Sequence, residues 1–235
     1  MKKPLSATAL KLIACITMLA DHLAYSFLLP GTVWYELLRI VGRMAFPIYG
    51  FLLTEGVNHT GNAKKYLLRL ALIAVLSEPA FDLMCFRCLI YIGRQSVMVT
   101  LLLGAAMCML MEKLPKYWMK PLTVIPFFFL AKLICCDYGT DGILMIALFM
   151  LTRGLPRRNL WLMPLFVLLC LYMGSWKVQL LGRPIPIQWF AVSALVPILL
   201  YSGHKGCRNK ALTWGMNLFY PVHMAIIVII QVILL

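Results

Sequence analysis

The sequence predicts an all-α fold, a polytopic integral membrane helical bundle with about nine (eight to ten) transmembrane helices and a cytoplasmic N-terminus. Three observations predict it. Hydrophobic residues make up 63% of the 235 residues, whereas charged residues make up only 13%, about half the share that is usual in soluble domains. Apolar segments recur along the whole chain, and short stretches rich in Pro, Gly or charge separate them. Basic residues concentrate in alternate separators, as they do in membrane proteins with several crossings.

In order along the chain, we expect apolar helices at residues 10–29, 38–57, 66–81, 96–112, 120–136, 139–152, 160–175, 187–202 and 212–234. A bilayer core of ~30 Å asks for about 20 residues per crossing, so several of these segments are short. The segments 139–152 and 160–175 are the doubtful ones and could instead be re-entrant or half-spans. No linker is long enough to divide two domains, so residues 1–235 are expected to form a single domain.

The distribution of Lys and Arg predicts the orientation. With a cytoplasmic N-terminus and nine crossings, the inner stretches hold fourteen basic residues: Lys2, Lys3, Lys64, Lys65, Arg69, Lys113, Lys116, Lys120, Arg153, Arg157, Arg158, Lys205, Arg208 and Lys210. The outer stretches hold five: Arg39, Arg87, Arg94, Lys177 and Arg183. This bias follows the positive-inside rule, so it accounts for the net charge of +14 without a nucleic-acid partner. We expect a multi-pass protein of the cell (inner) membrane of a bacterium.

The first apolar segment carries three ionisable side chains, Lys11, Asp21 and His22. Such groups cost roughly 2.5 to 3.5 kcal/mol at the centre of a membrane helix, so they normally face a protein interior or a water-filled cavity. Lys11 and His22 are eleven residues apart and therefore lie on one helix face, about 16 Å apart along the axis. Asp21 points ~100° away from His22, so a second helix must supply its partner. The first segment is therefore a candidate functional site.

The predicted topology brings six groups to a similar depth in the membrane, namely Asp21, His22, Arg43, Glu78, Lys132 and His223. A histidine there can act as a general base. A carboxylate from Asp21 or Glu78 could fix its tautomer, while Arg43 could stabilise a developing negative charge. The alternative is that these groups form structural ion pairs. Lys11 lies nearer the cytoplasm, where it could meet phosphate groups, or it could extend to the membrane interface.

Several motifs, in order over nearly the whole chain, resemble the TraX family of membrane proteins: LKLIACITMLADH, RIVGRMAFPIYGFLLTEG, KKYLLRL, LSEPAFD, TLLLG, DYGTDGILMI, LYSGHKG and FYPVHM. TraX proteins are grouped with the transmembrane acyltransferases, which include acyltransferase 3 and heparan-glucosaminide N-acetyltransferase. The resemblance implies that Lys11 and His22 match a basic-x10-His motif in which the histidine is catalytic. It also implies that residues 42–47 and 220–223 line the site.

From the residues and the resemblance together, we expect an acetyl-CoA-dependent acyltransferase that acylates a hydroxyl or amine at the membrane or its outer side. The expected catalytic residues are His22, Asp21, Arg43 and Glu78. The residues expected to bind the acyl-CoA are Lys11, Lys65, Arg69 and His223. No metal is expected, the acceptor is an unknown small molecule, glycan or peptide, and a homodimer is possible. The alternatives are a secondary transporter and a membrane assembly subunit without enzymatic activity.

Overall fold

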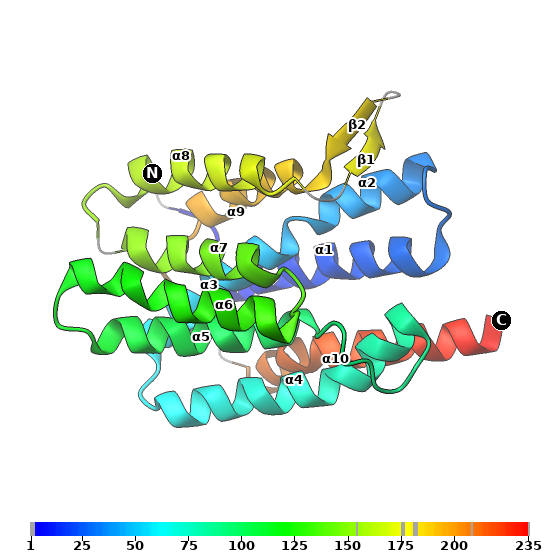
Figure 1. The fold of residues 1–235 in the computed structure, drawn as a ribbon, viewed down its shortest axis with the longest axis horizontal. Helices are drawn as coiled ribbons and strands as arrows, with labels where there is room; N and C mark the ends of the chain where they lie inside the picture. The colour runs from blue at the N-terminus through cyan, green and yellow to red at the C-terminus, as the bar shows by residue number, and fades with distance from the viewer. Residues whose placement is uncertain (1–2, 154, 175–176, 181–182, 208, 235) are drawn as a thin grey trace. The chain divides into compact units, whose positions relative to one another are not determined.

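The computed structural model describes residues 3–153, 155–174, 177–180, 183–207 and 209–234, and most of them are helical (Figure 1). The sequence predicted an all-α fold, and the structure confirms that the chain is mostly helical. Lys2 and Arg208, which belong to the predicted inner basic set, lie outside the described residues, as does the last residue of the segment 160–175.

Each of the nine predicted apolar segments coincides with helix. The helical elements, with η marking 3-10 helix, are α1 (Ala7–Phe27), α2 (Val33–Gly42), α3 (Ala45–His59), α4 (Ala63–Phe86), α5 (Val97–Lys113), η1 (Tyr117–Thr123), α6 (Val124–Ile134), α7 (Gly139–Arg153), α8 (Arg158–Tyr172), η2 (Ile187–Ala194), α9 (Leu195–Leu199) and α10 (Lys210–Leu234). The sequence did not predict the antiparallel pair β1 (Lys177–Leu180) and β2 (Arg183–Pro186), which pairs Val178 with Ile185. Each strand has only four residues, too few to show a clear alternation of polar and apolar residues.

Among the described residues, four helical stretches are long and apolar enough to cross a membrane: Ala7–Phe27, Val33–His59, Tyr117–Ile134 and Ala211–Leu234. The chain is therefore a membrane protein, but the number of nine crossings is not confirmed. Helix length gives one reason. The helices α7 and α8 have 15 residues each, and at 1.5 Å per residue each is about 22 Å long, short of the ~30 Å hydrocarbon core.

The structure divides into two compact units, and the single-domain prediction stays a prediction. The first unit is built from the residues up to Tyr49 and from Met163 onward. Its first helix, α1, begins at an N-cap, Ser6, whose side chain accepts a hydrogen bond from the Ala9 N–H, and this satisfies one of the unpaired donors of the first turn. Helix α1 packs against both α2 and α10 (Figure 1).

The second unit comprises Gly50–Leu162. Here α5 packs against α4 and α7, and α6 packs against α7. Its core is formed by fully buried apolar side chains on α5 and α7, among them Met107, Met111, Ile143, Ile146 and Phe149. Each unit therefore buries its own apolar core around a central helix, α1 in the first and α5 in the second.

Candidate functional site

A buried carboxylate on α1 binds two arginines. Asp21 Oδ2 accepts a hydrogen bond from Arg39 Nη1 at 2.7 Å, and its Oδ1 accepts from Arg43 Nη2 at 2.6 Å. The three side chains are only 10%, 16% and 13% exposed. Charge-assisted bonds of this length are among the strong hydrogen bonds of proteins. One carboxylate thus pairs with two guanidinium groups, which leaves this triad with a net positive charge.

The local sequence of α2 explains why both arginines reach Asp21. Arg39 and Arg43 are four residues apart, so they lie on the same helix face. Between them, Gly42 lets α2 approach α1 closely, because an added Cβ would overlap the Asp21 side chain, with its Cγ only 2.7 Å away. A glycine at this position is therefore required by the packing of the two helices around the ion pair.

A pair of histidines joins α1 to α10 beside this triad. His22 Nδ1 lies 2.7 Å from His223 Nε2, and the two rings are stacked with an interplanar angle of 6°. His223 Nδ1 lies 2.6 Å from the carbonyl oxygen of Phe219. A carbonyl only accepts hydrogen bonds, so Nδ1 of His223 carries a proton. In a neutral His223 the Nε2 then accepts from the His22 Nδ1–H, which leaves a lone pair on His22 Nε2.

A second polar contact between the same two helices lies nearer their N-terminal ends, where Lys11 Nζ donates to Asn217 Oδ1. Along α1 the contacts run from Lys11 to His22, and along α10 they run from Asn217 to His223. The two helices are therefore parallel, as Figure 1 also shows. Lys11 and His22 lie on one face of α1, as predicted, and both point to α10.

The three helices of this site are thus held together by contacts between polar side chains. Buried polar contacts of this kind fix the register of helices, because a shift would leave charges and ring nitrogens unpaired. The aromatic rings of Phe219 and Tyr220 complete the surroundings of His223, at centroid distances of 4.7 and 5.7 Å. The arrangement can hold a proton on the histidine pair and an anion beside the two arginines.

Glu78, which the sequence analysis assigned to the same site, belongs to the second unit. Its Oε1 accepts hydrogen bonds from the hydroxyl and the N–H of Ser96 at 2.7 and 3.1 Å. Ser96 is the N-cap of α5 and makes no capping bond with its own side chain. The carboxylate of Glu78 therefore serves as the cap of α5.

The predicted cofactor residues Lys65 and Arg69 also lie in the second unit, on the exposed first turns of α4. The Arg69 guanidinium lies over the Tyr66 ring, 5.3 Å from its centroid.

The second unit also contains a charged cluster that the sequence analysis did not predict. In it Glu55 faces Arg153 and Arg158, with nitrogen to oxygen distances of 3.8 and 3.6 Å.

The structure brings Lys11, Asp21, His22, Arg43 and His223 to one site in the first unit, and these five came from the sequence. Two partners were missed, Arg39 and Asn217. Arg39 was assigned to an outer loop, yet its spacing of four from Arg43 was a usable indication of a shared helix face. Asn217 carries no charge, and nothing in its spacing distinguishes it from other polar residues of the apolar segment.

The comparisons with known proteins identify the family. The family model described as TraX protein matches residues 6–231. The chain belongs to the TraX family. This TraX chain is 30% identical, over 234 residues, to the "Probable fimbrial assembly protein FimC, serogroup H1" of Dichelobacter nodosus, and the match covers 94% of each chain. No solved structure matches this TraX chain.

These findings correct the expected function. The sequence analysis took acyl transfer as the main interpretation and a membrane assembly subunit as an alternative. The relative that matches this TraX chain over almost its full length is named for fimbrial assembly. The acyltransferase interpretation is therefore wrong as the main assignment, and the assembly alternative agrees better with the comparisons.

Proposed function

We propose that this protein is a membrane subunit of a fimbrial assembly apparatus, located in the cell (inner) membrane with several crossings. The observation that carries the proposal is the similarity to a fimbrial assembly protein, which extends over 94% of both chains. A full-length match relates whole proteins, whereas a local match relates only a shared module.

The first unit suits a stable membrane scaffold. Its long C-terminal helix exposes large apolar side chains, among them Ile229 at 57%, Val232 at 71% and Ile233 at 76%. A soluble protein would not expose so many on one helix, and a lipid bilayer covers them. On the inner side of the same helix, His223 is buried against His22. The helix therefore exposes apolar side chains that suit lipid and places His223 where it meets α1.

The test is a deletion of the gene in the organism that carries it, followed by electron microscopy of the cell surface and immunoblotting of the fimbrial subunit. We expect cells without fimbriae that still contain the fimbrial subunit, because assembly is lost and synthesis is not. Wild-type chain should restore the fimbriae. Normal fimbriation in the deletion strain would refute the assembly role, and loss of the subunit itself would indicate a role in its synthesis or stability.

A pair of complementing variants connects the site to this role. Asp21→Asn removes the charge that holds both arginines, whereas Glu112→Gln removes a charge from a side chain that is 45% exposed and 3.6 Å from Lys120. We expect the Asp21 variant to restore few fimbriae at a matched protein level and the Glu112 variant to restore them fully. Equal restoration by both would separate the triad from assembly.

We propose further that the N-terminus is cytoplasmic and that the α1–α2 turn faces the outside. The parallel course of α1 and α10 supports one part of this proposal, because the C-terminal ends of the two helices then lie on the same side of the membrane. Labelling of Leu29→Cys and Val232→Cys with a membrane-impermeant thiol reagent should succeed from outside the cell, and labelling of Gly61→Cys should need permeabilised cells. Opposite results for Leu29 and Val232 would contradict the parallel crossing.

Other expectations from the sequence stay predictions and form no part of this proposal. They are the binding of acetyl-CoA, an enzymatic activity, the relationship to acyltransferase 3 and to heparan-glucosaminide N-acetyltransferase, and a homodimer. The transporter alternative has no specific observation in its favour.

A further inference from the structure

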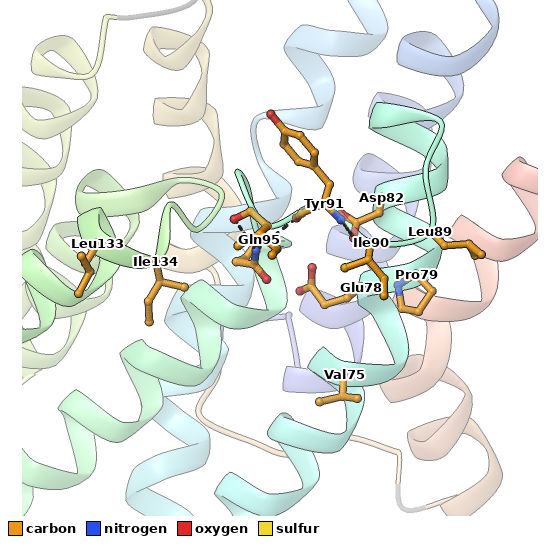
Figure 2. A pocket seen from close by; sticks show the side chains of 11 residues that line it. Val75, Glu78, Pro79, Asp82, Leu89, Ile90, Tyr91, Gln95, Leu133 and Ile134 are labelled. Carbon is orange, nitrogen blue, oxygen red and sulfur yellow. Dashed lines mark hydrogen bonds between the residues drawn. The ribbon is translucent and has the colours of Figure 1, made fainter.

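The second unit contains a cavity of about 520 Å³ beside the C-terminal half of α4. Its lining comes from α4, from the loop that leads to α5 and from the end of α6. Figure 2 shows the side chains around it, which are Val75, Glu78, Pro79, Asp82, Leu89, Ile90, Tyr91, Ile92, Gln95, Leu133 and Ile134. The volume is within the range of pockets that hold small organic molecules.

The charge of this lining is opposite to that of the chain. The whole protein has 22 Lys and Arg against 8 Asp and Glu, yet the cavity is lined by two acidic residues, Glu78 and Asp82, and by no Lys, Arg or His. The two carboxylates are four residues apart on α4, so they lie on one helix face. Like charges at this spacing repel each other, and a bound cation would relieve the repulsion.

Most polar groups of the lining accept hydrogen bonds, and two of its donors, the Tyr91 N–H and the Gln95 side-chain amide, already have partners. The Tyr91 N–H donates to Asp82 Oδ2 at 2.8 Å, and Gln95 Nε2 donates to the Tyr91 and Ile92 carbonyls. Ser96 donates to Glu78. The acceptor Gln95 Oε1 remains in the lining. The cavity therefore suits a ligand that brings its own hydrogen-bond donors.

One further acceptor of the lining lacks a donor among the described residues. Asp82 is only 3% exposed, and its buried Oδ1 has no hydrogen-bond partner among the described residues, a state that is costly for a carboxylate. Pro79 lies inside α4 and has no N–H to donate to the Val75 carbonyl four residues earlier. Figure 2 shows the Glu78 and Asp82 side chains on the side of α4 that faces the Ile90–Tyr91 stretch.

The remaining walls are aliphatic and open outward. Ile90 and Ile92 are 80% and 84% exposed, and Leu133 on α6 is 80% exposed. Leu133 belongs to Tyr117–Ile134, a stretch long and apolar enough to span a membrane, of which only 11% is buried within the protein. The outer rim of the cavity therefore continues into a surface that suits hydrocarbon chains.

We propose that this cavity binds the primary ammonium head group of a membrane amphiphile. The ammonium carries one positive charge for the two carboxylates and three N–H donors for their oxygens and for Gln95 Oε1. The acyl or alkyl chain lies along Ile90, Ile92 and Leu133. The inference goes beyond the proposed assembly role and does not depend on it.

The first test compares head groups of one chain length. Calorimetry on the purified full-length protein in detergent would measure binding of dodecylamine, dodecyltrimethylammonium and dodecanol. We expect dodecylamine to bind at least tenfold more tightly than the other two, because the trimethylammonium group has charge without N–H donors and the alcohol has no charge. Equal affinities for the three probes would overturn the proposal.

Two variants localise the binding. Asp82→Asn keeps an oxygen for the Tyr91 N–H but removes the charge, so we expect folding to persist and dodecylamine affinity to fall about tenfold or more. Glu112→Gln removes one acidic charge from the same unit outside the cavity lining, and its affinity should match that of the wild type. Unchanged binding by a folded Asp82→Asn variant, or an equal loss in both variants, would place the ligand elsewhere.

The source of the ammonium is tested with lipids and peptides. Native mass spectrometry should show more bound phosphatidylethanolamine than phosphatidylcholine of the same acyl chains, and Asp82→Asn should abolish the difference. No preference between the two lipids would overturn the assignment to a membrane amphiphile. A competition experiment then compares the lipid with a short apolar peptide that has a free N-terminal amine. If the peptide displaces dodecylamine more strongly than the lipid does, the site binds a peptide instead.

Discussion

Replacing Asp21 by Asn would leave two buried arginines without their shared counter-ion. In the native structure the carboxylate receives Arg39 Nη1 at 2.7 Å and Arg43 Nη2 at 2.6 Å. Asparagine is almost the same size, so the variant changes the charge and little of the packing. The single amide oxygen can accept a hydrogen bond from only one of the two guanidinium groups. The amide NH₂ would then face the other guanidinium, and both of these groups are hydrogen-bond donors.

The size of the effect follows from the burial. All three side chains are 16% exposed or less, so solvent screens the interaction far less than it does at a surface ion pair. Removing one partner of a buried ion pair costs about 3–5 kcal/mol. For chains of 150–250 residues, each kcal/mol lowers Tm by about 2–4 °C, so the expected decrease in Tm is roughly 6–20 °C.

The assay is thermal unfolding of the purified protein in detergent, followed by tryptophan fluorescence. Glu112→Gln is the matched control, because its pair with Lys120 is exposed and at 3.6 Å, and such pairs contribute about 1 kcal/mol or less. A third protein replaces Asp21 by Leu together with Arg39→Met and Arg43→Met. It should recover most of the lost stability, since apolar residues can replace a buried ionic group at little cost.

Two results would refute this reasoning. An Asp21→Asn variant as stable as the Glu112 control would show that the triad contributes nothing measurable. The triple apolar variant could also be less stable than Asp21→Asn. That result would show that apolar packing cannot replace the contribution of the charged side chains to the contact between α1 and α2.

Three further predictions concern neighbouring contacts, each measured by the same unfolding assay. Gly42→Ala should destabilise the protein by about 1–3 kcal/mol, because the new Cβ overlaps the Asp21 side chain and such overpacking typically costs that much. An unchanged Tm would mean that α2 can move away from α1 at no cost in stability. His223→Phe keeps the stacked ring but removes the acceptor of the His22 ring N–H, so a loss of about 1–3 kcal/mol is expected, and a gain would argue against the inferred tautomer. Glu55→Gln should lower Tm less than Asp21→Asn does, since its arginine contacts are longer, at 3.6 and 3.8 Å, and the reverse order would make the second-unit cluster the stronger one.

The sequence predicted much of the site because charge in an apolar segment is conspicuous. Lys11, Asp21, His22, Arg43 and His223 all lie in the first unit, on or next to helices that were recognised as apolar segments. Their pairing was not predictable. Asp21 adjoins His22 in the sequence but pairs with α2, and His22 pairs with a residue of α10 that lies 201 positions later.

Glu78 illustrates the limit of arguments from depth in the membrane. Its estimated depth matched that of His22, but depth gives no information about lateral position. In the structure Glu78 caps α5 within the second unit. The β1–β2 pair was missed for a different reason, because four-residue strands are too short to show a period in the sequence.

The sequence by itself determined that this is a helical membrane protein, where its apolar segments lie and which residues carry charge within them. Hydropathy and helical spacing are local properties, and a contiguous stretch of chain is enough to show them. The tertiary structure alone decided the partners: Arg39 with Asp21, Asn217 with Lys11, and the loop after α4 that closes a cavity over Glu78 and Asp82. Such contacts depend on which helices pack together and at which register. That choice is made by the close packing of the whole unit, which no single segment encodes.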